Sequence, residues 1–169
     1  MIRRIVVGVA IMLWIAIGLV AILFLTEVGG RVMARIFPIG EVEVVDFPRL
    51  VLRPTSNQYL VCPTDLCSAV PDFTSKEFEV SAAMLQKQWQ AIMDLDSSIT
   101  LLISSQKKAQ LDYVYRTPYW QFPDIITVRF IALGPSRSTL AIYSRSVYGR
   151  DDLGANKARV QKWLHAMGQ

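Results

Sequence analysis

The sequence predicts an α+β domain, an antiparallel four- to five-stranded sheet with two helices on one face, preceded by a single transmembrane helix. Three observations predict this class. Residues 5–25 carry no charged side chain, residues 82–95 and 153–167 repeat apolar side chains at helical spacing, and the segments between those two helices have strand patterns. Because these strands follow one another without intervening helices, we expect hairpin pairing and therefore an antiparallel sheet.

The uncharged run near the N-terminus has the length of a membrane span. At about 1.5 Å per residue, residues 5–25 form a helix of about 31 Å, which matches the hydrocarbon core of a bilayer. The run is longer than the apolar region of a secretory signal, and no small-x-small cleavage site follows it. We therefore expect an uncleaved anchor over residues 1–27. Two arginines precede the run and two follow it, so the flanking charges do not decide its orientation in the membrane. The short leader before the run favours an N-terminus on the cytoplasmic side and a domain on the outer side.

The segment after the anchor is predicted to lead into one globular domain. Residues 28–56 read as a juxtamembrane segment, beginning with a short interfacial helix, and an extended arm broken by prolines; residues 57–169 read as the domain. A short strand at 59–61 enters a loop with the only cysteines of the chain, Cys62 and Cys67. The pair could form a disulfide, stay as two thiols, or take part in metal or redox chemistry. A disulfide is the simplest outcome in an oxidising compartment.

The remaining elements follow from periodicity and capping residues. Ser81 is a suitable N-cap for the helix over residues 82–95, whose large apolar side chains face one way. Strand patterns follow at residues 99–105, 111–117, 125–132 and 139–146. Asp152 is the expected N-cap of the last helix, over residues 153–167.

The charge of the chain does not indicate a nucleic-acid partner. Of the formal net charge of +4, residues 1–40 hold 4 arginines and 1 glutamate (net +3), and residues 41–169 hold 14 basic and 13 acidic residues (net +1). The excess therefore lies at the membrane flanks, where anionic headgroups attract it. The familiar nucleotide-binding, metalloprotease and hydrolase motifs do not occur, and His165, the only histidine, falls on the polar side of the last helix. We predict no metal and no cofactor.

Polar residues gather where the last helix begins. Asn156 falls within about 30° of the apolar centre of that helix, so its amide points at the sheet. Arg159 lies at the edge of the same face, one turn from Asn156. The candidates near them, on the last two strands, are Asp124, Ser144, Arg145 and Ser146.

Two interpretations of these residues are open. In the first they form a polar lock, because a buried amide must find partners or destabilise the fold by about 1–3 kcal/mol. In the second they line a small polar pocket beside the helix N-terminus, where the free N–H groups of Leu153, Gly154 and Ala155 could hold an anion.

The stretch Ser144-Arg-Ser-Val-Tyr-Gly-Arg-Asp-Asp-Leu-Gly-Ala-Asn-Lys-Ala-Arg159 carries a resemblance. It resembles the C-terminal signature of DUF1499, a bacterial domain family of unknown function. Phe122-Pro-Asp124 and Asn57-Gln-Tyr-Leu-Val-Cys-Pro63 are similar to two weaker elements of that family, and together the likeness covers about residues 53–167. The sequence departs from the family at Ile125, where a second acid is common, and at Val147, where a basic residue is common. The resemblance implies fold and extent, but no activity.

These observations predict a membrane-anchored envelope protein that serves as a non-catalytic binding or assembly module at the membrane surface. The alternative is an envelope hydrolase or transferase that uses a polar pocket around Asp124, Asn156 and Arg159. The expected partners are the lipid bilayer, through the N-terminal helix, and an envelope protein or a small anionic or lipid ligand. We expect the inner membrane, with the domain on the periplasmic side.

Overall fold

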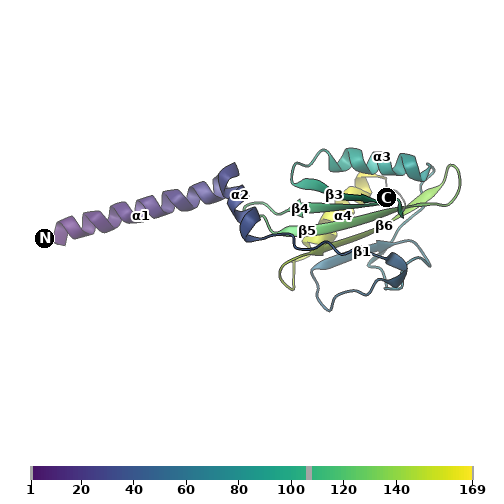
Figure 1. The fold of residues 1–169 in the computed structure, drawn as a ribbon, viewed down its shortest axis with the longest axis horizontal. Helices are drawn as coiled ribbons and strands as arrows, with labels where there is room; N and C mark the ends of the chain where they lie inside the picture. Colours follow the sequence, from purple (N-terminus) through teal and green to yellow (C-terminus); the bar gives the residue numbers. More distant parts are fainter. Residues whose placement is uncertain (1, 106–107, 169) are drawn as a thin grey trace. The chain divides into compact units, whose positions relative to one another are not determined.

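The computed structural model describes residues 2–105 and 108–168. In this part of the chain there are four α-helices and a six-stranded mixed sheet, so the α+β class predicted from the sequence is confirmed (Figure 1). By their contacts the residues form two compact units, one of residues 1–38 with 117–122, and one of residues 39–116 with 123–169. The segment predicted over residues 28–56 is therefore divided: its first part, through residue 38, belongs to the first unit, and the extended arm belongs to the second.

The first unit contains the apolar helix. Helix α1 spans Ile2–Leu25, and its stretch Arg4–Ile22 is long and apolar enough to cross a membrane, with none of that stretch buried within the protein. A signal sequence has the same properties. Helix α2 (Glu27–Ile36) follows at once, and the Thr26 hydroxyl caps it by accepting a hydrogen bond from the Gly29 N–H at 3.2 Å. This is the short helix that the sequence predicts after the apolar run.

The sheet differs from the prediction in strand number and in direction. Its order is β2-β1-β6-β5-β4-β3, made of β1 (Gln58–Cys62), β2 (Phe73–Thr74), β3 (Ile99–Ser105), β4 (Gln110–Arg116), β5 (Pro123–Ala132) and β6 (Ser138–Ser146). The sheet has six strands rather than four to five, and it is mixed rather than antiparallel because β2 pairs with β1 in parallel. Strand β2 has two residues, too few for an alternating pattern, so local sequence could not reveal it.

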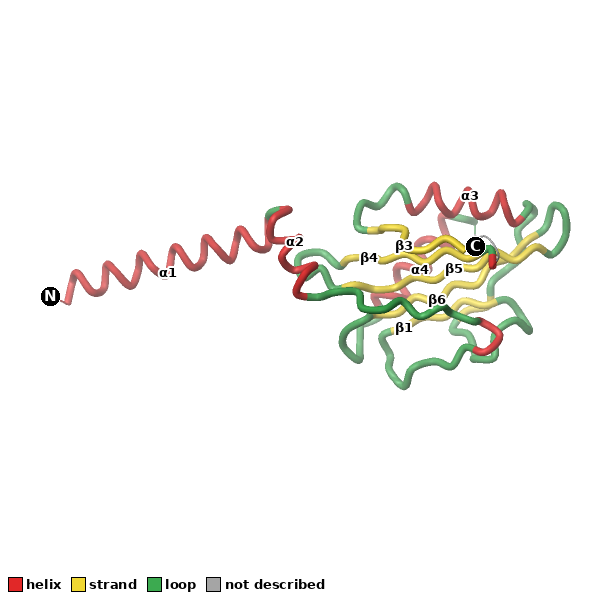
Figure 2. The backbone as a smooth tube through the Cα atoms, viewed as in Figure 1, coloured by secondary structure: helices red, strands yellow, loops and turns green. Residues whose placement is uncertain are grey.

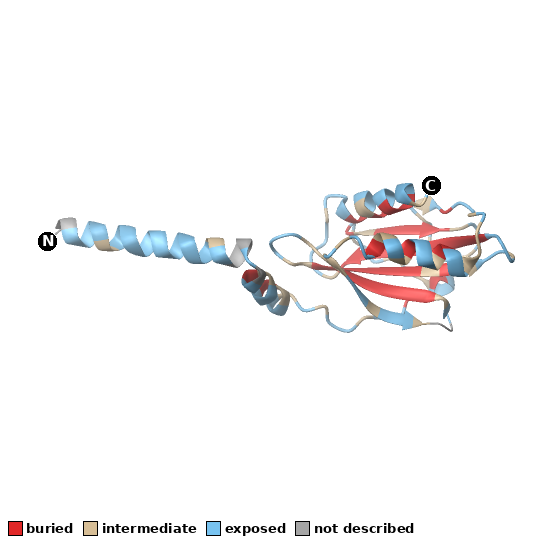
Figure 3. Cartoon of the chain, turned by 90° about the horizontal axis from the view of Figure 1, so that it is seen from above, coloured by how far each residue is buried: buried red, intermediate tan, exposed pale blue. Residues whose placement is uncertain are grey.

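Both helices of the globular unit pack on one face of the sheet. Helix α3 (Ala82–Met93) and helix α4 (Ala155–Ala166) share a core with buried side chains of the four strands β1, β4, β5 and β6. Trp89 and Trp163, one from each helix, meet edge to face with ring centroids 5.6 Å apart. Figure 3 shows buried residues along the central strands and on the sides of these helices that face them.

The opposite face of the sheet is covered by the extended arm. The arm runs across this face as a loop with a short 3-10 turn, η1 (Phe47–Arg49), as Figure 2 shows. Val45 and Phe47 are buried there with Leu60, Ala141 and Tyr143 in a second, smaller core. The arm is thus a structural layer of the globular unit, because it buries the apolar side chains that strand alternation points away from the helices.

Cys62 and Cys67 are paired as a disulfide, with their Cα atoms 6.3 Å apart. The sequence left open a disulfide, two free thiols, or metal or redox chemistry, and the structure has the disulfide. Cys62 ends β1, and the closed loop leads the chain toward β2.

We expect the double substitution Cys62→Ser and Cys67→Ser to lower the free energy of unfolding by about 2 kcal/mol, because the closed loop is short and restricts the unfolded chain only modestly. Urea unfolding of the oxidised chain, the chain reduced with dithiothreitol and the double variant measures it. The reduced chain should match the variant. A loss above about 4 kcal/mol would contradict the loop-entropy origin of the effect.

Candidate functional site

The last two strands place polar side chains on both faces of the sheet. In the antiparallel register Asp124 lies opposite Ser146, and Ile126 lies opposite Ser144. Because successive side chains point to opposite faces, Asp124, Ser144 and Ser146 face the helices, whereas Arg145 faces the arm. We name the first group, with its partners Asn156, Arg159 and Asp152 from α4 and the turn before it, the helix-face cluster. The second group is the arm-face cluster, made of Asp112, Thr127, Tyr143, Arg145 and Arg53.

Asn156 is the centre of the helix-face cluster. It is fully buried, as its position on the helical wheel predicts. Its Oδ1 accepts hydrogen bonds from the Ser144 hydroxyl and from Arg159 Nη1 (3.2 Å). Its amide nitrogen donates to the Ser146 hydroxyl (3.1 Å) and to the Asp152 carboxylate (2.7 Å). One side chain therefore joins the last strand, the turn and the helix.

Arg159 forms the second junction of this cluster. Its Nη2 donates to Asp124 Oδ2 at 2.7 Å, and the two side chains are only 11% and 4% exposed. The guanidinium carbon also lies 3.8 Å from the ring centroid of Tyr115, which pairs with Asp124 across β4 and β5. The charge of Asp124 is thus balanced by a buried ion pair.

The turn before α4 differs from the prediction. The helix begins at Ala155 with Gly154 as its N-cap, in the left-handed conformation (φ 78°), and not at residue 153 with Asp152 as its N-cap. Glycine adopts this conformation without strain, which lets the turn tighten after Asp152. The Asp152 carboxylate still accepts hydrogen bonds from the N–H groups of Gly154 (3.0 Å) and Asn156 (2.8 Å).

The N–H groups considered for an anion are already engaged. Leu153 donates to Asp151 Oδ1 (2.6 Å), Gly154 to Asp152 Oδ1, and Ala155 to the Asp152 carbonyl (3.0 Å). The hydrogen bonds from the Ser56 hydroxyl and the Leu153 N–H lower the pKa of Asp151 from its usual value, so this carboxylate stays ionised. An anion at this helix end would have to displace two carboxylates.

The helix-face cluster therefore has the chemistry of an internal network. Ser144 is fully buried and its hydroxyl donates to Asn156, so it has no adjacent base that could activate it as a nucleophile. His165 is exposed on α4, as predicted. The structure brings together Asp124, Ser144, Ser146, Asp152, Asn156 and Arg159, and it puts Arg145 on the other face. The roles of these residues stay predictions.

The arm-face cluster has a buried cation at its centre. Arg145 is 5% exposed, and its Nη1 donates to the Thr127 hydroxyl at 3.2 Å. That hydroxyl donates in turn to Asp112 Oδ1 at 2.5 Å. The guanidinium carbon lies 4.8 Å from the ring centroid of Tyr143. Burial lowers the pKa of Arg145 from its usual value, and the nearby cation of Arg53 lowers it further.

Arg145 opens onto two pockets between the sheet and the arm. The larger has a volume of about 290 Å³ and the smaller about 100 Å³. Both are lined by Arg145, Arg53 and Glu43, so the two arginines lie at the junction between them. The other lining residues are mixed in character. Val44, Val45, Leu50, Val51 and Tyr143 join the charged Asp46 and Arg49 around the larger pocket, and Ile39, Val42, Ile125 and Val147 join Glu41 around the smaller.

The charges around these pockets leave the arginines without a direct ion pair. Among the described residues, no carboxylate oxygen lies within 4.0 Å of the Arg145 or Arg53 guanidinium. Arg53 Nη1 donates to the Ser146 carbonyl at 3.1 Å, which fixes this exposed side chain against the strand. Asp46 and Arg49, at the rim, are 4.0 Å apart and balance each other.

Sequence reasoning missed most of the arm-face cluster. Thr127 and Asp112 lie on predicted strands, and alternation along its own strand places Thr127 on the face opposite Asp124 and Ile126. Arg53 lies in the arm, where no periodicity relates it to a strand. Asn57, also missed, is buried and donates to the Gly149 carbonyl at 2.9 Å, which ties the start of β1 to the turn before α4.

The fold and the two clusters define the class of this protein, an α+β domain with a buried polar junction between its last strand and last helix, preceded by an apolar helix. The chain belongs to the family described as protein of unknown function DUF1499, whose match covers residues 57–167. The resemblance predicted from the C-terminal signature is thereby confirmed. A comparison with curated proteins found no match.

Proposed function

We propose that the protein is a membrane-anchored, non-catalytic binding module whose domain holds a small ligand through a carboxylate or phosphate group. The observation that carries this proposal is Arg145, a residue that is 5% exposed, has no direct carboxylate partner among the described residues and lines a pocket. Helix α1 serves as an uncleaved anchor. The disulfide of Cys62 and Cys67 supports a domain on the oxidising, periplasmic side of an inner membrane.

The chemistry of Arg145 favours an anion over other ligands. Removing a charge from water without a partner destabilises a fold by several kcal/mol, so a buried arginine is normally paired. Asp112 is linked to this charge through the Thr127 hydroxyl, and Asp112 and Glu43 act on the guanidinium without a direct ion pair. A planar guanidinium binds carboxylate or phosphate oxygens with two parallel hydrogen bonds, and Arg53 adds a second donor at the same junction.

The side chains that line the pocket restrict the class of ligand further. Val44 and Val51, which line the larger pocket, are 63% and 84% exposed and offer apolar surface beside the arginines. An anionic head on the arginines with a short apolar tail along these valines would satisfy both surfaces. The volume of about 290 Å³ suits a small ligand. Such a head could belong to a free metabolite or to a lipid.

The enzyme alternative around Asp124, Asn156 and Arg159 has less support. The carboxylate, the amide and the guanidinium are buried against one another, and their hydrogen-bonding groups are engaged. A polar lock between strand, turn and helix accounts for all of these contacts. We therefore assign ligand binding to the arm face and stabilisation to the helix face.

Thermal unfolding of the full-length chain in a neutral detergent tests the proposal, with inorganic phosphate, hexanoate, hexyl phosphate and the neutral hexanol as probes. We expect hexyl phosphate to raise the Tm most and hexanol to leave it unchanged, because a ligand that binds only the folded state stabilises it by about 2.7 kcal/mol at a hundred times its Kd. Vesicles containing phosphatidic acid, compared with free hexyl phosphate, distinguish a lipid headgroup from a free anion.

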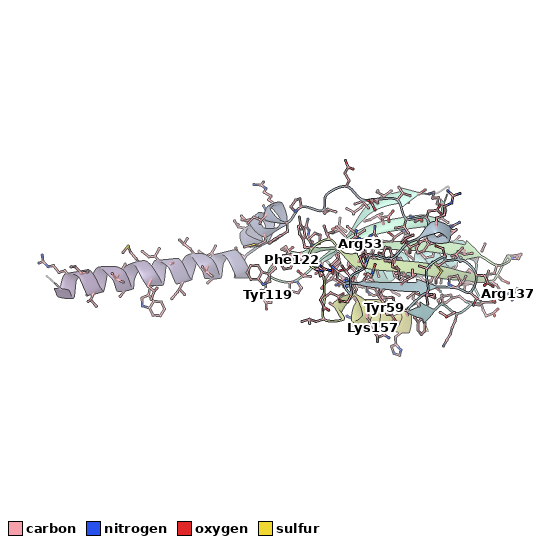
Figure 4. All side chains as sticks on the ribbon, turned by 90° about the horizontal axis from the view of Figure 1, so that it is seen from below. Arg53, Tyr59, Tyr119, Phe122, Arg137 and Lys157 are labelled. Atoms are coloured by element: carbon pink, nitrogen blue, oxygen red, sulfur yellow. A yellow bond between two sulfur atoms is a disulfide. The ribbon has the colours of Figure 1, made fainter. Side chains whose placement is uncertain are left out.

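Two variants should remove the response. Arg145→Gln removes the buried cation, and Arg53→Gln removes an exposed one, so the second variant should fold even where the first does not. Arg137→Gln is the matched control, because Arg137 is 54% exposed and lies at the opposite end of the sheet from Arg53 (Figure 4). A Tm response to hexyl phosphate that survives Arg53→Gln, or an equal response to hexanol, would contradict the proposal.

A further inference from the structure

The loop between β4 and β5 belongs to the same compact unit as the apolar helix. Residues 117–122 group with residues 1–38 rather than with the strands that they connect. The rings of Phe37 and Phe122 meet edge to face with centroids 4.5 Å apart, and Gln121 lies beside Gly30 of α2. The loop is therefore packed along α2, which begins two residues after α1 ends.

This loop is held by internal hydrogen bonds and exposes two aromatic rings. The Thr117 N–H donates to the Phe122 carbonyl (3.0 Å), the Gln121 N–H to the Thr117 carbonyl (3.1 Å), and the Phe122 N–H to the Thr117 hydroxyl (2.9 Å). Tyr119 is 60% exposed and Trp120 is 50% exposed, and Trp120 stacks on Phe122 with ring centroids 6.2 Å apart. Figure 4 shows Tyr119 and Phe122 in this loop.

The backbone of the loop is strained in order to hold this arrangement. Tyr119 and Gln121 have φ values of 61° and 55°, in the left-handed region that side chains other than glycine rarely adopt. Such a conformation costs on the order of 1–3 kcal/mol and persists where the surroundings fix it, frequently at binding surfaces. A loop that served only as a connection would have no need to expose two large aromatic rings at this energetic cost.

The position of the loop relative to the anchor suggests its partner. A bilayer has a headgroup region of about 5–8 Å on each side of its hydrocarbon core. Gly30, beside which Gln121 of the loop lies, comes five positions after the last residue of α1, close to where an anchoring helix would leave that core. Tryptophan and tyrosine are enriched at this level, because their rings prefer the apolar side and their polar atoms the wet side. Arg31 and Arg35 of α2 add positive charge that anionic headgroups attract.

We infer that residues 117–122 form a second membrane contact, in which Tyr119 and Trp120 insert into the lipid headgroup layer beside the end of α1. This inference rests on the proposed anchoring by α1, since the same unit must lie at a bilayer. The ligand of the loop is the lipid surface itself, and the loop is therefore distinct from the arm-face cluster. It gives the globular unit a second attachment to the membrane besides the chain that leaves α2.

Depth-dependent quenching of tryptophan fluorescence tests the inference. The full-length chain is reconstituted in phosphatidylcholine and phosphatidylglycerol vesicles that carry bromine either near the glycerol end of the acyl chains or near their middle. In the Trp14→Phe variant the quenching of Trp120 is measured, and in the Trp120→Phe variant the quenching of Trp14 is measured. Both variants retain the buried Trp89 and Trp163 as a common fluorescence background. We expect the shallow bromines to quench Trp120 about twofold more than the deep ones, and Trp14 to show the reverse order.

The reference for an exposed indole on the globular unit is Val70→Trp in a chain that also carries Trp14→Phe and Trp120→Phe, because Val70 is 85% exposed. Quenching of Trp120 above this reference supports the inference. Quenching of Trp14 with Trp120 quenched no more than the reference overturns the inference and leaves the anchor in place. Absence of quenching at Trp14 overturns the anchor itself, and with it the loop contact.

Discussion

Replacing Asn156 by alanine should lower the free energy of unfolding by about 3–5 kcal/mol, because several buried polar partners lose their hydrogen bond at once. The Ser144 and Ser146 hydroxyls, the Asp152 carboxylate and Arg159 all contact this amide. Alanine supplies neither a donor nor an acceptor, and the space that remains is enclosed. Urea unfolding of the full-length chain, followed by tryptophan fluorescence, measures the loss, since Trp163 lies on the same helix.

The matched control is Lys157→Ala, one residue further along α4. Lys157 is exposed (Figure 4), so its removal should change the free energy of unfolding by less than about 0.5 kcal/mol. If Asn156→Ala unfolds at the same urea concentration as Lys157→Ala, the polar lock is not a source of stability. The enzyme alternative would then regain weight, because a buried polar network that does not stabilise needs another explanation.

Breaking the ion pair of Asp124 and Arg159 should lower the free energy of unfolding about as much as Asn156→Ala does. We expect Asp124→Ala to destabilise the fold by about 3–5 kcal/mol, because it leaves the Arg159 charge largely buried without its partner. The double variant Asp124→Ala with Arg159→Met should lose less than the sum of the two single variants, since it leaves no unpaired charge. Urea unfolding of the four chains gives the coupling free energy directly.

An exposed ion pair between two loops beside the sheet supplies the comparison. Arg137 Nη1 and Glu77 Oε2 are 3.2 Å apart, but their side chains are 54% and 55% exposed. Glu77→Ala should therefore cost less than about 1 kcal/mol, and added salt should weaken this pair more than the buried one. Equal losses from Asp124→Ala and Glu77→Ala would contradict the assignment of Asp124 to a stabilising network.

The helices and the long strands of this protein are predictable because their signals are local. The apolar faces of α3 and α4 and the alternation along β5 and β6 repeat at the periods of helix and strand, so each segment reports its own buried side. The position of Asn156 on α4 follows from the same rule. The parallel strand β2 could not be predicted from the sequence, because two residues are too few to show a period. The start of α4 was predicted two residues too early, because Gly154 adopts a left-handed conformation that delays the helix.

The two candidate clusters differ in the same way: one could be predicted from the sequence and the other could not. The helix-face cluster was within reach because its members lie on one helix and two adjacent strands, with spacing that defines their faces. The arm-face cluster was not, because Arg53 reaches Arg145 only after the arm has folded across the sheet. The loop of residues 117–122 likewise meets Phe37 from a distant part of the chain.

The sequence by itself determined an apolar helix long enough to span a membrane, one α+β domain after it, and the family to which that domain belongs. Only the tertiary structure decided that the arm covers the second face of the sheet, that Arg145 and Arg53 share a pocket, and that an aromatic loop packs along α2. The physical reason is that periodicity reports whether a side chain is buried, whereas the identity of the surface that buries it depends on contacts between segments far apart in the chain.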